Sequence, residues 1–520
     1  MDTVLVLDFG SQLAHLIARR VRDLGVYSEI LPFNTSKSKI QSINPIGVIL
    51  SGGPSSVYEE GAPQPLEEFW DYIKEHQTPL LGLCYGHHLI GQHYQGKIVA
   101  HDEKEFGKAT ITLKQQTSIF DSLNSEEIVW MSHGDQVEEL PEGFEIFAST
   151  DTCPIAAMGN IAKKIFSFQF HAEVNHTVHG ETMFRNFLFQ ICKANPEWKI
   201  ENWIDDAIKD IQNTVGENHV ILGLSGGVDS SVVAALLKKA IGDKVHLIFV
   251  NNGVLRKNEV EQVCDWFQNK FKFANFHLAD AEEEFLTNLK GVEDPEKKRK
   301  IIGHTFIDVF ERKAIELEQK FDNIKFLAQG TIYPDRVESQ AGSGGKTSSK
   351  IKSHHNLALP DDMKLKILEP LKDLYKDEVR ELGKQLGLPR ELIERHPFPG
   401  PGLAVRCIGD ITKEKLEILR EADSIVIEEI RNAGLYNHVW QAFAVFLPVK
   451  SVGVMGDFRT YEYLCGLRIV ESIDAMTANF AKIDWEVLEH ISTRIINEVK
   501  GFNRVVYDIS NKPPSTIEFE

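Results

Sequence analysis

Short apolar runs alternate with helical patterns over the first 195 residues of the chain. The runs predict buried strands at Val4–Leu7, Ile46–Leu50 and Pro79–Leu83. Between the first two, one face of a predicted helix that ends at Gly25 carries Leu13, Leu16, Ile17, Val21 and Leu24. Such alternation predicts a parallel sheet with helices on both faces, and ligands of these sheets gather at the carboxyl ends of the strands.

The same alternation returns after a polar segment, Ala194–Glu201, that contains Asn195-Pro196 and is typical of a domain linker. Apolar runs at Val220–Leu224 and Val245–Val250 predict strands on either side of a helix that Gly242 ends. We therefore expect an α/β protein with two doubly wound domains and mainly parallel sheets, at residues 1–195 and 196–395.

From Gly402 onward the pattern changes. A helical stretch, Lys413–Asn432, is followed by runs of period two at Ala442–Val449 and Arg504–Ile509. This mixture predicts a small α+β domain at residues 396–520. A folded tail without a partner is the alternative.

Composition narrows the function classes. A length of 520 residues suits about three domains at ~150 residues each. A net charge of −19 argues against a broad nucleic-acid surface, and no apolar run is long enough to cross a membrane. Six scattered cysteines without C-x-x-C spacing predict neither a disulfide framework nor a zinc site. The N-terminus enters a strand without a leader pattern, so we expect a cytoplasmic protein.

A glycine-rich turn joins the strand Val220–Leu224 to the helix that follows it. The turn reads Ser225, Gly226, Gly227, Val228, Asp229, Ser230 and Ser231. Glycines let the backbone approach a phosphate, the helix N-terminus binds it, and the hydroxyls add donors. Because an acid, Asp229, stands where a kinase-type loop would offer a cation, we expect Mg²⁺ to bridge Asp229 and a polyphosphate. The turn resembles that of the N-type ATP pyrophosphatases, which adenylate a substrate; a simple Gly-Ser turn is the alternative.

A second loop, Gly82-Leu83-Cys84-Tyr85-Gly86, has the spacing of a nucleophile elbow. Cys84 would lie at a helix N-terminus, which favours the thiolate, although a lone cysteine is more often a small buried hydrophobe. His171 follows another predicted strand, and Glu173 stands two residues later to hold the imidazole. Cys84, His171 and Glu173 thus provide a nucleophile, a base and an orienting group for acyl transfer.

These two features resemble the class I glutamine amidotransferases over roughly residues 1–195. The resemblance implies hydrolysis of glutamine through a thioester, with backbone N–H groups of Gly53 and Tyr85 stabilising the oxyanion. In the segment Trp130–Asp135 it assigns Asp135 to the substrate's amino group, while His133 is either part of this site or a surface residue. Ala172 stands where the family usually has proline.

Lys352, His354 and His355 lie together after a flexible stretch, Ala341–Lys346. A Lys and two His in one mobile segment suit a lid that clamps phosphates, and a plain polar surface is the alternative. Similarly, the charged run after Asp294 opens a helix and is either a solvated face or part of a site.

The order of these motifs along nearly the whole chain resembles the family of glutamine-hydrolysing GMP synthases. The motifs are SGGVDSS, GVEDPEKKRKIIG, LAQGTIYPD, IKSHHN, HPFPGPGLAVR and NKPPSTIEFE. The resemblance implies that xanthosine monophosphate (XMP), ATP and glutamine are substrates, and that residues from 396 on form a homodimer. It also implies that XMP is bound by Arg256, Gln441, Lys512 and Glu518, with Pro399–Gly402 on the phosphate side.

Three further positions depart from the family pattern. Asn251 replaces a common Asp, Phe519 replaces Trp, and the segment Asn356–Pro360 is shorter and lacks a glycine pair. Two rival classes remain: another ammonia-using synthetase, such as an NAD synthetase or a tRNA-modifying enzyme, and a non-catalytic sensor. The acidic charge counts against tRNA and the intact nucleophile against a sensor.

Overall fold

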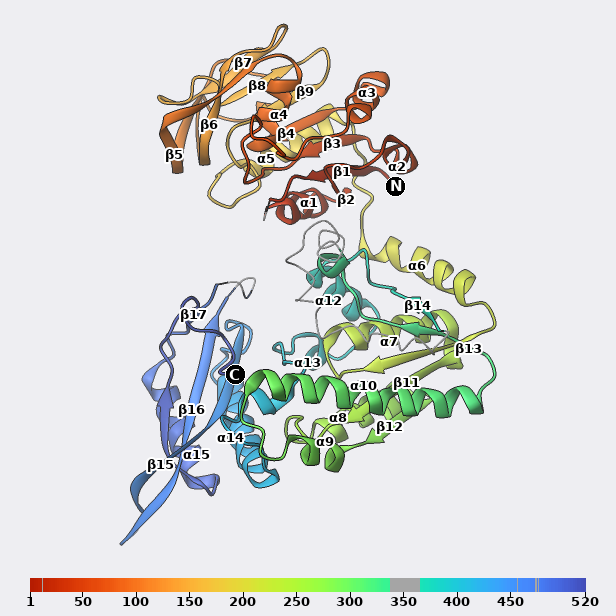
Figure 1. The fold of residues 1–520 in the computed structure, drawn as a ribbon, viewed down its shortest axis with the longest axis vertical. Coiled ribbons are helices and arrows are strands. Elements are labelled where there is room, and N and C mark those ends of the chain that lie inside the picture. Colours follow the sequence, from red (N-terminus) through yellow and green to blue (C-terminus); the bar gives the residue numbers. More distant parts are fainter. Residues whose placement is uncertain (12, 337–364, 456, 473–474, 476) are drawn as a thin grey trace. The chain divides into compact units, whose positions relative to one another are not determined.

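A computed structural model describes residues 1–11, 13–336, 365–455, 457–472, 475 and 477–520. The chain divides into two compact units (Figure 1). The first comprises Met1–Trp203, and the second begins at Ile204 and includes the described residues up to Glu520. Among the described helices, none is both long and apolar enough to cross a membrane.

The first unit is built on a nine-stranded sheet in the order β2-β1-β3-β4-β9-β8-β7-β5-β6. Its parallel half contains β1 (Thr3–Asp8), β2 (Tyr27–Pro32), β3 (Gly47–Leu50), β4 (Leu80–Leu83) and β9 (Ile165–Phe168). Its antiparallel half contains β5 (Lys97–Leu113), β6 (Glu126–Glu139), β7 (Glu145–Ser149) and β8 (Ala157–Asn160). The helices are α1 (Ala14–Asp23), α2 (Lys37–Ile43), α3 (Glu67–His76), α4 (Tyr85–His93) and α5 (Gly180–Arg185).

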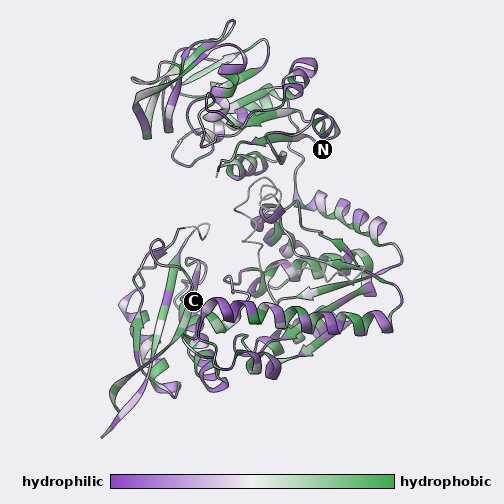
Figure 2. Cartoon of the chain, viewed as in Figure 1, coloured by the Kyte–Doolittle hydropathy of each residue, from purple (hydrophilic) through white to green (hydrophobic). Residues whose placement is uncertain are grey.

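The three strands predicted in this unit are confirmed as β1, β3 and β4, and the predicted helix as α1. Figure 2 shows these central strands largely in the hydrophobic colour. Leu5, Leu50 and Leu80 are completely buried in one cluster because the parallel strands are covered on both faces. The cluster fixes the strand ends from which the loops of the first site extend.

The second unit contains a parallel sheet in the order β12-β11-β10-β13-β14. Its strands are β10 (His219–Leu224), β11 (Val245–Asn251), β12 (Phe276–Asp280), β13 (Ile324–Ala328) and β14 (Lys366–Leu368). The helices are α6 (Ile200–Val215), α7 (Val228–Ile241), α8 (Glu259–Cys264), α9 (Glu282–Leu289), α10 (Pro295–Lys320), α12 (Lys376–Gln385) and α13 (Arg390–Ile393). From β10 the chain first adds β11 and β12 on one side and then β13 and β14 on the other. The switch point between β10 and β13 is the usual position of a ligand in such a sheet.

The C-terminal part of this unit pairs a four-stranded sheet with two helices. The sheet joins β15 (Gln441–Met455), β16 (Phe458–Glu471), β17 (Asn479–Phe480) and β18 (Phe502–Tyr507), and the helices are α14 (Lys413–Asn432) and α15 (Trp485–Glu498). The predicted α+β fold of this region is therefore confirmed. One hydrophobic cluster includes Val309 of α10, Leu416 of α14 and Ala444 of β15, so the sheet packs directly on the α/β part of the unit.

Three histidines form a row across the parallel sheet near the amino ends of its strands. His219 Nδ1 lies 2.8 Å from His246 Nε2, and His246 Nδ1 lies 3.3 Å from His277 Nε2. The central imidazole is completely buried and packs edge-on against Phe321. The row lies at the end of β10 opposite to the glycine-rich turn.

Candidate active sites

Cys84 lies in a sharp turn between β4 and α4. Its backbone has φ 52° and ψ −102°, a conformation that is uncommon for a residue with a side chain. The flanking glycines are required sterically. A Cβ at Gly82 would lie 2.5 Å from the carbonyl oxygen of Gly86, and one at Gly86 would lie 2.6 Å from that of Leu50. The predicted elbow is therefore present.

His171 lies between Cys84 and Glu173. Its Nδ1 is 2.7 Å from Glu173 Oε1, and Cys84 is close enough to raise its pKa. Burial alone would lower the pKa of His171, but Glu173 and Cys84 outweigh it and raise that pKa to about 11. Such an imidazole is the cationic partner that stabilises a thiolate. The structure thus brings the three predicted residues together.

The loop after β3 covers this cluster. A Cβ at Gly52 would lie 3.2 Å from His171 Cε1 and 3.8 Å from Cys84 Cβ, so only glycine leaves this space open. Gly53 packs against the ring of Tyr85, where a Cβ would approach within 3.2 Å. The two residues predicted to offer oxyanion donors are therefore neighbours.

Strand β6 supplies the opposite wall. The Cys84 thiol lies 3.7 Å from the carbonyl oxygen of Ser132, three residues before Asp135. Asp135 Oδ1 accepts a hydrogen bond of 2.8 Å from the Tyr58 hydroxyl. His133 is buried, with Nε2 3.0 Å from Glu105 Oε2 and Nδ1 2.9 Å from the backbone oxygen of Asp135. The alternative that His133 is a surface residue is wrong.

The predicted anion-binding turn lies at the switch point of the second unit. Gly226 has φ 73°, and the turn is held by its own hydroxyls: Ser225 Oγ accepts from Gly227 N at 3.2 Å, and Ser231 Oγ donates to Gly227 O at 2.7 Å. Val228 begins α7, with Asp229 in its first turn and Ser230 bonded to the amide of Ser225. The turn thus places backbone N–H groups at a helix N-terminus, where an anion is stabilised.

Asp229 is paired with a lysine that the sequence pattern did not indicate. Lys376, the first residue of α12, has its Nζ 2.7 Å from each oxygen of the Asp229 carboxylate. Gly330, just after β13, leaves room there, since a Cβ would lie 3.4 Å from that of Asp229. Lys376 therefore brings to the turn the cation that the turn itself lacks.

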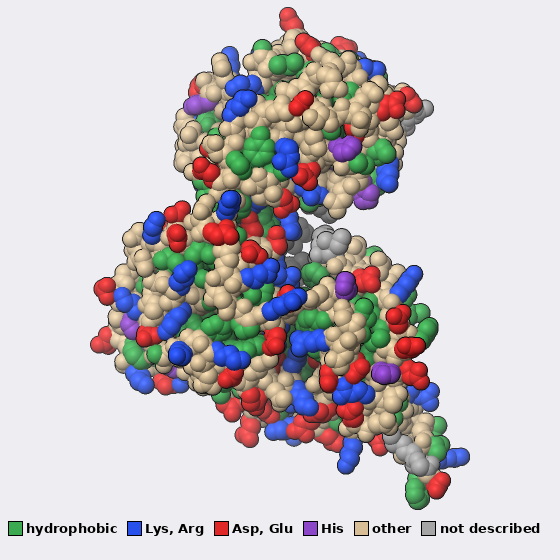
Figure 3. All heavy atoms as spheres, turned by 180° about the vertical axis from the view of Figure 1, so that it is seen from behind, with side chains coloured by type: hydrophobic (Ala, Val, Ile, Leu, Met, Phe, Trp, Pro, Cys, Tyr) green, Lys and Arg blue, Asp and Glu red, His purple; other side chains and the backbone are tan. Residues whose placement is uncertain are grey.

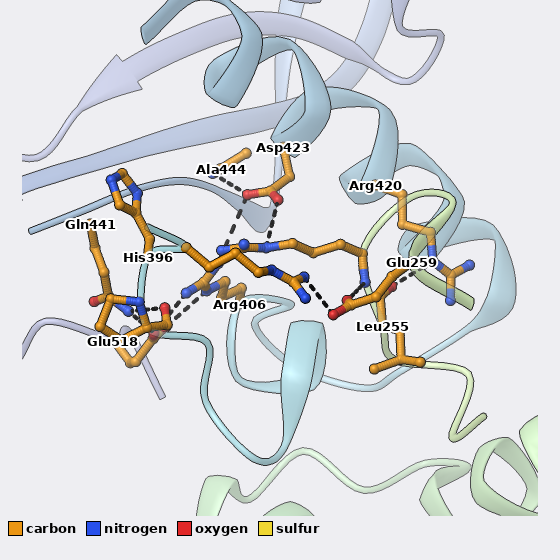
Figure 4. A network of polar contacts seen from close by, with 12 residues as sticks. Leu255, Glu259, His396, Arg406, Arg420, Asp423, Gln441, Ala444 and Glu518 are labelled. Carbon is orange, nitrogen blue, oxygen red and sulfur yellow. Dashed lines mark hydrogen bonds and ion pairs between the residues drawn. The ribbon is translucent and has the colours of Figure 1, made fainter. Parts of the chain in front are cut away.

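Figure 4 shows a third cluster, where the tail meets the segment after α13. Arg406, completely buried, donates to both oxygens of Glu518 at 2.8 and 3.0 Å. Gln441 donates to Pro397 O at 2.6 Å and lies 3.5 Å from Glu518 Oε1. Arg256 Nε is 3.5 Å from Asp423 Oδ2.

This cluster has buried donors without hydrogen-bond partners in the described part of the chain. They are Arg256 Nε and Nη2 and Arg406 Nη1, and both guanidinium groups lie against the ring of Phe398. Buried donors of this kind suit a polar ligand with acceptor oxygens. Arg256, Gln441 and Glu518, three of the four residues predicted to bind XMP, belong to the cluster.

Lys512, the fourth, is held elsewhere. Its Nζ donates to Ala475 O at 2.8 Å, and its backbone pairs with Ala478. Sequence reasoning missed Arg406 and Asp423; Arg406 ends the motif HPFPGPGLAVR, whereas no local signal marks Asp423 inside α14. The lid residues Lys352, His354 and His355, and the short segment Asn356–Pro360, lie outside the described residues.

Asn251, one of the departures, has a structural partner. Its Nδ2 donates to Asp280 Oδ1 at 2.9 Å, and its Oδ1 accepts from Gly253 N at 3.1 Å. An aspartate could not donate to Asp280 and would face it as a like charge, so the amide suits this neighbour.

Comparisons with known proteins match three successive parts of the chain. A family model of class-I glutamine amidotransferases matches residues 5–191, one of NAD synthase matches residues 199–299, and one of the GMP synthase C-terminal domain matches residues 428–519. Together with the elbow and the glycine-rich turn, these matches define a class I glutamine amidotransferase joined to an ATP-using synthetase domain.

Relatives extend the match to the whole length. The chain is 54% identical to a glutamine-hydrolysing GMP synthase of Brachyspira hyodysenteriae over 100% of this chain and 99% of the relative. It is also 54% identical to that of Aquifex aeolicus over 99% of both chains. The chain therefore belongs to the family of glutamine-hydrolysing GMP synthases. A solved structure from Thermoplasma acidophilum, described as that of a putative GMP synthase subunit, is 35% identical with a TM-score of 0.35, covering 37% of this chain and 94% of that one.

Proposed function

We propose that Cys84, His171 and Glu173 hydrolyse glutamine and so supply the ammonia for synthesis of GMP from XMP. Cys84 Sγ forms a bond to the amide carbon, and His171 gives its proton to the departing nitrogen as ammonia. Water then hydrolyses the thioester, with His171 as base, to release glutamate. Glu173 holds the imidazole through Nδ1, while N–H groups of Gly53 and Tyr85 stabilise the oxyanion and Asp135 binds the substrate's ammonium.

The family's overall reaction is the glutamine-dependent conversion of XMP to GMP with use of ATP. ATP adenylates the C2 oxygen of XMP with release of pyrophosphate, and ammonia then displaces AMP. The β10–α7 turn, from Ser225 to Ser231, is proposed to bind the phosphates of ATP. Lys376 would move from Asp229 toward them when the nucleotide binds.

Mg²⁺ is proposed to be held by Asp229. This residue fits the ion because a partly exposed carboxylate beside a phosphate-binding turn offers the hard oxygen ligands that Mg²⁺ prefers. When bound, the ion would neutralise phosphate charge. Lys352, His354 and His355 are proposed to close over the same phosphates as a lid.

XMP is proposed to bind at the cluster of Arg256, Gln441 and Glu518, with Lys512 contributing from the tail. The guanidinium donors that lack a hydrogen-bond partner within the described chain support this assignment, because the xanthine ring and the phosphate carry acceptor oxygens. In domain terms, residues 1–195 form the amidotransferase, 196–395 the adenylating domain, and 396–520 the nucleotide-binding and dimerisation domain.

A homodimer through the C-terminal domain, in the cytoplasm, completes the proposal. Strands β15 and β16 carry large apolar side chains that are 51–78% exposed, and such side chains reach the surface of this hairpin near its tip (Figure 3). These side chains are Val449, Val452, Val454, Phe458 and Tyr461. A patch of this kind marks an interaction surface.

The main support for this function is that three sites occur in one chain: the acyl-transfer cluster around Cys84, the glycine-rich turn that begins at Ser225, and the arginine cluster around Arg406. The test supplies ATP, Mg²⁺ and either glutamine or ammonia, with XMP or deamido-NAD as acceptor. We expect GMP, AMP and pyrophosphate from XMP with both nitrogen sources. Amidation of deamido-NAD instead of XMP would overturn the assignment.

A further inference from the structure

Tyr58 makes a contact that the proposed mechanism does not use. We propose that Tyr58 is a positioning residue of the glutamine site, which orients the Asp135 carboxylate toward the α-ammonium of the substrate. This inference rests on the proposed role of Asp135 and concerns how the amidotransferase selects glutamine.

The backbone of Asp135 is fixed independently of its side chain. Its carbonyl oxygen accepts from His133 Nδ1 at 2.9 Å, and His133 is held in turn by Glu105 at 3.0 Å. Among the described residues, the Tyr58 hydroxyl is the one hydrogen-bond donor to the carboxylate itself, at 2.8 Å from Oδ1. Tyr58 therefore orients the side chain of Asp135, whose backbone is already fixed by His133.

The loop that carries Tyr58 is anchored on both sides of it. Val57 O accepts hydrogen bonds from Gln64 and Gln92 at 3.3 and 3.2 Å. Pro63 O accepts from the Tyr85 hydroxyl at 2.8 Å, and Tyr85 follows the nucleophile directly. The Tyr58 ring itself is 51% exposed. Tyr58 thus links a loop that is tied to the elbow with the strand that carries Asp135.

The chemistry of the contact explains why it matters. A hydroxyl that donates to Oδ1 leaves Oδ2 available to a cation, and it limits rotation of the carboxylate toward solvent. An α-ammonium is what distinguishes glutamine from glutaramate, the analogue with the same amide and no amino group. Loss of the hydroxyl should therefore weaken selection for glutamine without touching the groups that break the amide bond.

The experiment measures kcat and KM of the full-length Tyr58→Phe variant with glutamine and with glutaramate. We expect KM for glutamine to rise about tenfold with little change in kcat, since one hydrogen bond to a charged group is lost. The preference for glutamine over glutaramate in kcat/KM should fall by a similar factor. Tyr94→Phe is the matched control, because the Tyr94 ring packs at a tilt against Phe144 and, among the described residues, has no hydrogen bond to Asp135.

Asp135→Asn separates the inference from the role on which it rests. If Asp135→Asn leaves KM and the preference for glutamine unchanged, the role of Asp135 is wrong and the inference falls with it. If Asp135→Asn weakens both but Tyr58→Phe does not, only the inference is wrong. When both act through one contact, adding Tyr58→Phe to Asp135→Asn produces no further loss. A uniform fall in kcat for both substrates would show a merely structural role and contradict the proposal.

Discussion

The protonation of one imidazole determines how the first site works. Burial alone would lower the pKa of His171. Glu173 and Cys84 outweigh burial and raise this pKa to about 11. His171 therefore stays cationic across the neutral range. Glu173 is completely buried, so its charge acts on His171 with little screening by water.

Glu173→Gln tests this assignment. The amide keeps a hydrogen bond but loses the charge, so the pKa of His171 should fall toward the value that burial alone would give. We expect the glutamine-dependent rate to decrease roughly a hundredfold. We also expect the alkaline limb of its pH profile to move to lower pH, because the imidazolium then loses its proton earlier. Steady-state rates between pH 6 and 10 check both, and a profile identical to wild type would contradict the triad.

Lys376→Met tests the second site at the same scale. Removing the cation leaves Asp229 without its partner and the phosphates without a neutralising charge. We expect KM for ATP to rise at least about tenfold and synthesis from both glutamine and ammonia to fall together. Lys384→Met is the control, since Lys384 lies on the same helix and, among the described residues, pairs with exposed Glu381. Normal ammonia-dependent synthesis in Lys376→Met would exclude a role in adenylation.

At the scale of elements, the parallel sheet of the second unit carries a pH-sensitive row of histidines. Burial lowers the pKa of His246 to about 4, helped by His219 and His277. Burial also lowers the pKa of His219, and nearby Lys244 adds to this effect. The pKa of His277 is lowered by burial and by Lys313 and Lys320, whereas Glu316 raises it. The unfolded chain therefore binds protons below pH ~6.5 that the folded sheet does not.

The sign of the effect follows from this difference. Stability is lost as the pH falls from 6.5 toward 4, by up to about 3 kcal/mol if His246 stays neutral throughout. We expect His246→Gln to be less stable at pH 7.5 but to have a flatter pH dependence, whereas exposed His490→Gln keeps the wild-type slope. Urea unfolding at several pH values checks this. Equal slopes for wild type and His246→Gln would contradict the assignment.

The elements that sequence patterns predicted are those with strong local signals. The strands before the glycine-rich turn and the elbow are confirmed, and α14 has the predicted ends, because buried parallel strands and capped helices show in neighbouring residues. The antiparallel half of the first sheet was not predicted. In β6 the burial alternates but the hydropathy does not follow it, because Glu127 and His133 are buried and Ile128 is exposed. Lys376 and Asp423 were also missed. Lys376 pairs with Asp229, 147 residues away in the sequence, and Asp423 bonds Ala444, 21 residues away, so neither contact leaves a local pattern.

At the scale of the whole molecule, the exposed apolar hairpin bears on assembly. Val454 and Phe458 are 73% and 78% exposed near the turn between β15 and β16. We expect Val454→Asp with Phe458→Asp to convert the proposed dimer to a monomer, because charges replace the apolar contact. Light scattering during size-exclusion chromatography measures this. Ile161→Asp, at a 50% exposed position in the first unit, should remain dimeric. A monomeric wild type would refute the dimer.

The backbone at Cys84 affects the energetics of the entire first unit. A non-glycine residue with this φ and ψ costs about 1–3 kcal/mol, which must be offset by the packing of β3, β4 and α4 around it. The amidotransferase unit therefore carries a permanent loss of stability for the sake of the position of its nucleophile. An inactive Cys84→Gly variant should consequently melt about 2–4 °C above wild type. At this single position, the residue that catalysis requires is not the one that gives the highest thermal stability.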